Sequence, residues 1–342
     1  VDIYRGETRQ KHLLDYLLFV SFFPYLLSGP IVRHNELAGQ YDDPALKTPD
    51  YRNIATGIFL FSLGLFKKIV IADTLAVWAN FGFDTAASLT LIEGWVVSLS
   101  YTLQLYFDFS GYTDMALGVA LLFNLKLPIN FNSPYKAVSI QDFWRRWHIS
   151  LSRFLRDYVY IPLGGSRVGD FKLYRNLLLT LLIGGLWHGA AWTFVFWGFL
   201  HGMALAVCRI WQKLNIRMNK VLAWLITFNF INIAWVFFRA HSWSDAIKVL
   251  KAMLGLNGTN LPESLTGALG FLAKYNVSFG GFLHQAVPIL LICLFLVIFP
   301  KNSMELKHNF KPSPVTAVII ATLAVTAILS MTRVSEFIYV NF

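Results

Sequence analysis

The sequence predicts an all-α, polytopic membrane helical bundle, and three observations support this fold class. Hydrophobic residues make up 56% of the 342 residues and only 14% are charged, compared with about 25% in an ordinary soluble domain. Several apolar stretches approach the ~20 residues that a helix needs to cross a bilayer. Lysine and arginine gather in the short connectors between those stretches, where topology signals and lipid-headgroup contacts lie. The formal charge of +10 therefore indicates membrane contacts rather than nucleic-acid binding.

The apolar stretches give the expected order of the elements. We expect seven to nine membrane helices or half-helices in a single membrane domain, residues 1–342. The polar stretches 34–53 and 239–285 are expected to lie outside the bilayer. The chain begins within a polar segment that is typical of a connector, so we expect further membrane helices upstream. The spanning or near-spanning stretches are 12–31, 54–80, 89–107, 111–125, 177–208, 219–238, 281–300 and 313–332, with Lys67 and Lys68 interrupting the second.

Residues 140–158 predict an amphipathic helix that lies flat at the headgroups. Ser139 is a candidate N-cap with Asp142 three residues later, a variant of the capping box. At ~100° per residue the apolar and charged side chains separate onto two faces. The apolar face contains Phe143, Trp144, Trp147, Leu151, Phe154, Leu155 and Tyr158, and the charged face contains Arg145, Arg146, Arg153, Arg156 and Asp157.

Two histidines are candidate functional residues. His148 falls at the edge of the apolar face, beside Trp144 and Leu155, where a boundary histidine bonded to a carbonyl is an alternative explanation. His188 lies in GGLWHGAAWTF, within a run, 177–200, that has no formally charged residue. An ionisable group in the membrane is a functional hypothesis by default, although an interhelical hydrogen bond would also explain it.

Metal and haem binding are weaker interpretations of the histidines. His188 and His201 are 13 residues apart, which is about 20 Å along a continuous helix and too far for one metal ion. The spacing would suit two stacked haems if a second helix repeated the pair. No second pair is present, so we expect no metal and no permanently bound cofactor.

Five segments carry a resemblance to a known family. They are SGPIVR (28–33), YFDFSGYTDMALG (106–118), NFNSPY (130–135), DFWRRWHISLSRFLRDYVYIPLGG (142–165) and GGLWHGAAWTFVFWG (184–198), and the carboxyl end EFIYVNF (336–342) fits as well. In this order they resemble the membrane-bound O-acyltransferase family, in particular the bacterial branch that acetylates alginate and peptidoglycan. The resemblance covers essentially the whole chain. It implies a helical bundle with a central funnel or tunnel.

The resemblance also implies roles for the histidines. The family's catalytic histidine maps onto His188, which would act as general base or transient acyl carrier. A second histidine implicated in activity maps onto His148, which would position the donor thioester or assist proton transfer. Acetyl transfer from a thioester to a hydroxyl needs a group that takes the hydroxyl proton, and a neutral imidazole can do so near pH 7.

Other side chains are expected to support this site. Asp108 and Asp114 lie in a segment so apolar that bare carboxylates would be costly, so we expect them to be hydrogen-bonded inside the bundle. Trp144 and Trp187, which neighbour the two histidine motifs, are expected to pack around the site. The arginines Arg145, Arg146, Arg153 and Arg156 could hold the phosphates of acetyl-CoA, the expected acyl donor. Anionic lipid headgroups are the alternative ligand for these arginines.

The sequence thus favours an O-acyltransferase in the bacterial inner membrane that moves acetyl groups from a cytoplasmic donor to an extracytoplasmic polysaccharide. By the resemblance, a separate SGNH-type transferase outside the membrane would complete the reaction as a partner. An alginate-type exopolysaccharide is the favoured acceptor and peptidoglycan the alternative. A non-enzymatic transporter is a second function class, but two similar halves with broken helices, which many transporters show, are not evident.

Overall fold

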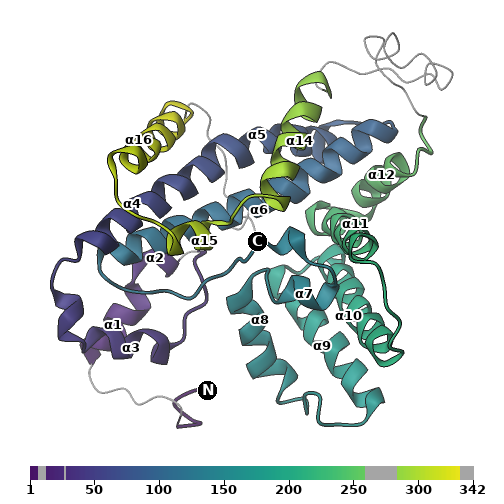
Figure 1. Ribbon diagram of the computed structural model, residues 1–342. Coiled ribbons are helices and arrows are strands. Elements are labelled where there is room, and N and C mark those ends of the chain that lie inside the picture. Colours follow the sequence, from purple (N-terminus) through teal and green to yellow (C-terminus); the bar gives the residue numbers. More distant parts are fainter. Residues whose placement is uncertain (7–12, 27, 259–282, 332–342) are drawn as a thin grey trace.

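The computed structural model describes residues 1–6, 13–26, 28–258 and 283–331, and within these ranges it contains helices and no strand (Figure 1). Part of the predicted loop 239–285 and the motif 336–342 lie outside the described residues. The α-helices are α1 (Leu13–Ser21), α2 (Phe23–Leu26), α3 (His34–Tyr41), α4 (Tyr51–Phe66), α5 (Asp73–Asn80), α6 (Leu91–Leu122), α7 (Ile140–Trp144), α8 (Ile149–Leu155), α9 (Asp170–His188), α10 (Trp192–Lys213), α11 (Lys220–Arg239), α12 (Trp243–Met253), α14 (Leu283–Ile298), α15 (Ser303–His308) and α16 (Pro314–Leu329). The predicted all-helical fold class is confirmed.

Local sequence signals explain where several helices begin. Thr90 and Glu93 form a capping box at the start of α6, and Asp50 accepts the amide hydrogens of Arg52 and Asn53 at the start of α4. Such side chains satisfy backbone N–H groups that have no partner within the helix. A polar residue before an apolar run therefore marks these helix starts in the sequence.

The helices α4 and α6 pack closely against each other along their length (Figure 1). A Cβ atom added at Gly64 would lie 2.4 Å from the carbonyl oxygen of Gly111, and one added at Gly57 would lie 2.7 Å from that of Gly118. Glycine at these positions lets the two backbones touch, as small residues do in membrane helix pairs. The helix α4 continues through a π-helical turn, Lys67–Ala72, into α5, which also packs on α6.

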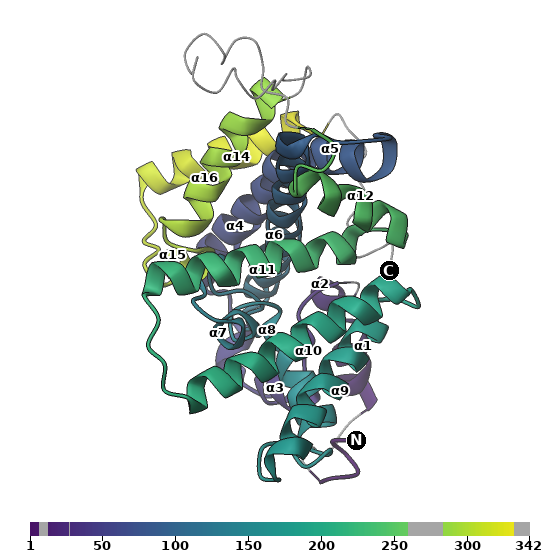
Figure 2. The ribbon, with the colours of Figure 1, turned by 90° about the vertical axis from the view of Figure 1, so that its right-hand side faces the viewer.

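A second helical unit consists of α9 and α10, which lie side by side and join α11 (Figure 2). Glycine again allows the close approach, because a Cβ atom at Gly198 would lie 2.3 Å from the carbonyl oxygen of Leu181. The chain reverses between His188 and Trp192. The predicted stretch 177–208 is therefore two antiparallel helices and not one.

The described helices differ from the expected membrane segments in other ways. Three continuous helical stretches, Tyr51–Thr85, Trp192–Lys213 and Lys220–Arg239, are long and apolar enough to cross a membrane, and Leu283–Ile298 and Pro314–Leu329 are shorter apolar helices. These are fewer long apolar helices, within the described residues, than the seven to nine membrane helices or half-helices that the sequence predicts. The stretches 89–107 and 111–125, predicted as two segments, merge into the 32-residue α6. Because Asp108 and Asp114 find partners inside the bundle, the helix continues through them.

The predicted helix over 140–158 is wrong as a single element. Ser139 caps it as expected, since its hydroxyl accepts the amide hydrogen of Asp142 at 3.1 Å, but α7 ends at Trp144. His148 then adopts a left-handed backbone with φ of 41° and ψ of 56° before α8 begins. A non-glycine residue in this conformation interrupts a right-handed helix. The break removes the single charged face that the helical wheel predicts for the four arginines.

Candidate active site

The fold brings His148 and His188 together, although they are 40 positions apart in the sequence. His148 precedes α8 and is 3% exposed, whereas His188 ends α9 and is 4% exposed. The ring of Trp187 contacts both, with its centroid 6.4 Å from that of His148 and 5.0 Å from that of His188. The sequence-predicted histidines thus form one site.

Aromatic rings hold the two imidazoles in place. Phe109 on α6 meets His148 edge-on at a centroid distance of 4.8 Å and an interplanar angle of 86°. His188 contacts Trp197 on α10 at 5.4 Å and Phe238 on α11 at 5.0 Å, also in edge arrangements. Rings in such contacts have little room to rotate. Trp187 is 54% exposed despite touching both histidines, so this side chain links the buried site to the surface.

Trp144 does not lie where the helical wheel places it. Instead of flanking His148, its ring packs against Trp197 at 5.8 Å and against His201 at 5.2 Å. The reason is the break after α7, because only a continuous helix would put Trp144 and His148 on one face.

His201 is a site neighbour that the sequence reasoning placed too far away. It is fully buried, and its ring lies 4.7 Å from that of Trp197, which also contacts His188. The expected separation of about 20 Å between His188 and His201 assumed one continuous helix, whereas the chain folds back between them. The apolar surroundings of His201 in GFLHGMAL resemble those of His188 and could have indicated it.

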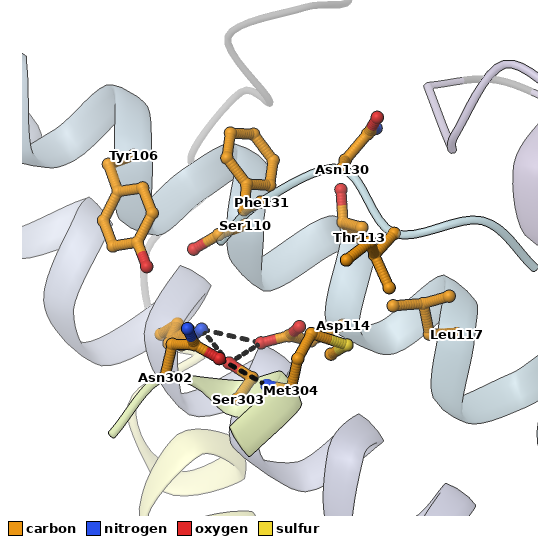
Figure 3. A pocket seen from close by; sticks show the side chains of 12 residues that line it. Tyr106, Ser110, Thr113, Asp114, Leu117, Asn130, Phe131, Asn302, Ser303 and Met304 are labelled. Carbon is orange, nitrogen blue, oxygen red and sulfur yellow. Dashed lines mark hydrogen bonds and ion pairs between the residues drawn. The ribbon is translucent and has the colours of Figure 1, made fainter. Parts of the chain in front are cut away.

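The two predicted aspartates are hydrogen-bonded inside the bundle, as expected. Lys67 Nζ lies 2.6 Å from Asp114 Oδ2, and the Ser303 hydroxyl donates to the same carboxylate oxygen at 2.6 Å (Figure 3). Lys68 Nζ lies 2.7 Å from Asp108 Oδ1 and 2.8 Å from Asp73 Oδ1. The lysines that seemed to interrupt a membrane segment are thus the counter-charges of the aspartates.

The Lys67–Asp114 ion pair borders the site. Asp114 lines a cavity of about 10 Å³ together with Thr113, Asn130 and Ser303 (Figure 3). Asn130 belongs to the loop that also contacts His148, at 3.3 Å between Oδ1 and Nδ1. The charged network and the histidine site therefore share a wall. Within the described residues, no group of three or more His, Cys, Asp or Glu side chains could hold a metal ion.

Three of the four predicted phosphate-binding arginines are paired with carboxylates. Arg146 Nε lies 2.8 Å from Asp142, and Arg153 Nη1 lies 2.8 Å from Glu36. Arg156 donates to Asp157 at 2.6 Å, and Arg33 binds the same carboxylate. Arg145 is exposed and is the one of the four with no ion pair among the described residues.

The pairing around Asp157 changes its acidity. The hydrogen bond from Arg156, assisted by Arg33, holds the pKa of the Asp157 carboxyl below its ordinary value of 3.8, although partial burial opposes the shift. A carboxylate that accepts hydrogen bonds from guanidinium groups is stabilised in its charged form. Asp157, through Arg33, and Arg153, through Glu36, therefore tie this segment to residues 33–36.

Comparisons with known proteins match the chain to relatives along most of its length. The peptidoglycan O-acetyltransferase of Helicobacter pylori is 53% identical over 345 residues, which cover 97% of this chain and 65% of the relative. A protein named probable alginate O-acetylase from Pseudomonas aeruginosa is 45% identical over 273 residues, 78% of this chain and 52% of the relative. The teichoic acid D-alanyltransferase of Bacillus subtilis is 29% identical over 238 residues, 63% of this chain and 58% of the relative.

The chain spans between about half and two thirds of the length of these relatives. The profile of the membrane-bound O-acyltransferase family matches residues 4–242, which include both histidines, the paired aspartates and the four arginines. The match therefore covers the site as well as the helices around it. This chain belongs to the membrane-bound O-acyltransferase family.

Proposed function

We propose that this chain is the membrane acyltransferase that moves acetyl groups from a cytoplasmic thioester to a polysaccharide outside the inner membrane. The observation that carries the proposal is the meeting of two buried histidines at Trp187. A pair of buried imidazoles suits proton transfer without free access of water, which limits hydrolysis of the thioester. The apolar helices and the family membership support a site that lies within a membrane.

In the proposed reaction, a hydroxyl oxygen of the acetyl acceptor attacks the carbonyl carbon of the acetyl thioester. His188 accepts the hydroxyl proton, a new C–O ester bond forms and the C–S bond breaks. The departing sulfur then takes this proton from His188, which restores the neutral base. His148 supports this step from beside Trp187, either by holding the thioester or by passing a proton. The edge contacts of His188 with Trp197 and Phe238 fix the direction of its ring.

Acetyl-CoA is the proposed donor. Its phosphates would meet Arg145, whose guanidinium is exposed, more readily than the three arginines already paired with carboxylates. The double variant Arg145→Ala, Arg146→Ala should weaken binding of acetyl-CoA to the purified protein and make it less sensitive to salt. Unchanged donor affinity with altered binding of anionic lipid would assign these arginines to headgroups instead.

Peptidoglycan is the first acceptor to test. The relative named for peptidoglycan has the higher identity of the two acetylating relatives, 53% against 45%, and its alignment covers 97% of this chain against 78%. The sequence alone favoured alginate, which remains the second candidate because of the alginate relatives. Both acceptors lie outside the inner membrane, so a partner transferase of the SGNH type is proposed to carry the acetyl group to the polymer.

The test measures polymer acetylation in cells that carry the partner and lack their own copy of this protein. Expression of the full-length protein should restore ester-linked acetate on peptidoglycan, released by mild alkali and quantified. His188→Ala should lower it by ~10²–10⁴-fold, the effect of losing a general base. His188→Gln keeps a hydrogen bond but accepts no proton near neutral pH, so it should be equally inactive. Near-normal acetylation by the Gln variant, at matched membrane levels, would contradict the role of His188.

A further inference from the structure

Three of the quoted sequence motifs are linked by hydrogen bonds around the side-chain oxygen of Asn130 and the hydroxyl of Ser150. This oxygen accepts a hydrogen bond from the Ser150 backbone N–H at 3.2 Å and from the Ser150 hydroxyl at 2.6 Å. It also lies 3.3 Å from His148 Nδ1. The Ser150 hydroxyl in turn accepts the amide hydrogen of Ile31 at 2.9 Å. The Asn130 amide therefore joins NFNSPY to WRRWHIS, and the Ser150 hydroxyl extends the link to SGPIVR.

These contacts determine which ring nitrogen of His148 carries the proton. A backbone N–H can only donate, so the Asn130 atom that faces Ser150 N must be the amide oxygen. An oxygen acceptor can contact Nδ1 only if Nδ1 carries a hydrogen. In a neutral imidazole the other nitrogen, Nε2, is then the one with a lone pair. The backbone of Ser150 thus fixes the tautomer of His148 through Asn130.

Asn130 also holds the unusual backbone at His148. Its carbonyl oxygen accepts the amide hydrogen of Ile149 at 3.0 Å, while the N–H of Asn132 donates to the Arg146 carbonyl at 2.9 Å. These two bonds bracket the left-handed turn at His148, a conformation that costs free energy and persists only where surrounding contacts offset that cost. Asn130 itself is completely buried. Figure 3 shows its amide pointing away from Asp114, so the amide is separate from the ion-pair network.

We infer that Asn130 is the positioning residue of the acyltransfer site, holding His148 with the proton on Nδ1 and Nε2 as the proton acceptor. The inference rests on the proposed function for its effect on acetyl transfer, but its geometric part does not. Nε2 can then take over the proton that His188 accepts from the hydroxyl and return it to the departing sulfur, and Asn130 keeps the ring from adopting the opposite tautomer. Asn130 touches neither reactant and acts through His148.

The experiment compares two substitutions of Asn130 with the same two at a buried asparagine elsewhere. Asn130→Ala removes the acceptor, and Asn130→Asp keeps an acceptor and adds a negative charge beside Nδ1. Asn124 is the matched control, because it is 4% exposed, its Nδ2 donates to the carbonyls of Leu46 and Thr48, and its φ is 60°. The first readout is solid-state ¹⁵N NMR of the full-length, histidine-labelled protein in lipid bilayers, with the His148 signals identified by their loss in His148→Gln.

The expected result is a proton on Nδ1 and none on Nε2 in the unmodified protein, with a mixture of tautomers in Asn130→Ala. Asn130→Asp should keep the tautomer and raise the pH at which His148 titrates, because an adjacent carboxylate stabilises the imidazolium. Substitutions at Asn124 should leave the His148 signals unchanged. A proton on Nε2 in the unmodified protein, or an unchanged tautomer in Asn130→Ala, overturns the inference.

The second readout is acetate transfer to the polymer at matched membrane levels. Asn130→Ala should lower kcat by about 10- to 100-fold, the scale of removing the partner that orients a functional histidine, with partial recovery in Asn130→Asp. If Asn130→Ala transfers acetate normally although NMR shows that His148 no longer keeps its proton on Nδ1, the positioning role is overturned. If the unmodified protein transfers no acetate, the proposed function fails, while the NMR result still decides how Asn130 holds His148.

Discussion

Replacing Asp114 with asparagine tests the buried ion pair between α6 and the π-helical turn Lys67–Ala72 that follows α4. Lys67 and Asp114 side chains are 11% and 5% exposed, and their charged atoms lie 2.6 Å apart. The substituted amide would keep the side-chain shape and could still bond Ser303, but the Lys67 ammonium would lose its counter-charge. Leaving one buried charge unpaired costs about 3–5 kcal/mol. The free energy of unfolding in mixed detergent–SDS micelles should fall by that amount.

The double variant Lys67→Met, Asp114→Leu separates charge from packing. Because no unpaired charge remains, its free energy of unfolding should lie close to that of the unmodified protein. It should be several kcal/mol higher than the value expected if the losses of Lys67→Met and Asp114→Leu simply added. Asp142→Asn breaks the more exposed pair with Arg146 and serves as the comparison, with an expected loss of about 0.3–0.5 kcal/mol. Additive losses in the double variant would refute the claim that the buried pair is a matched unit.

Two further predictions concern packing and pH. Gly64→Ala should lower stability by about 1–3 kcal/mol through overpacking against Gly111, whereas Gly39→Ala, with no atom within 4 Å of the added carbon, should lose none. Equal thermal midpoints for the two alanine variants would contradict the close approach of α4 and α6. Arg156 and Arg33 lower the pKa of Asp157, so its contribution to stability is present above the ordinary carboxyl value of 3.8 and declines as pH falls through the lowered pKa. Asp157→Asn should therefore be less stable at neutral pH and lose less on acidification below about pH 4. A parallel loss on acidification in both proteins, measured by thermal midpoint against pH, would argue against this pairing.

Much of the site could be predicted from the sequence because its signals are local. A histidine in an uncharged run marks His188, and a capping serine marks the start of α7 at Ser139. Carboxylates in an apolar stretch require partners, which is why Asp108 and Asp114 were expected to be bonded inside the bundle. The positions of the residues in the sequence could not identify Lys67 and Lys68 as those partners, because ion pairs between helices depend on which helix faces meet in the fold.

The sequence by itself determined the fold class, the family and the two histidines, since composition and motifs are properties of the chain alone. The tertiary structure decided where the helices break and what the breaks bring together. The turn at His148 depends on hydrogen bonds from residues near 130, and the reversal after His188 places His201 beside the shared Trp197. A helical wheel assumes a continuous helix, so it put Trp144 beside His148 and the four arginines on one face. Contacts from distant segments outweigh the local preference for helix at His148, and only the folded chain contains those contacts.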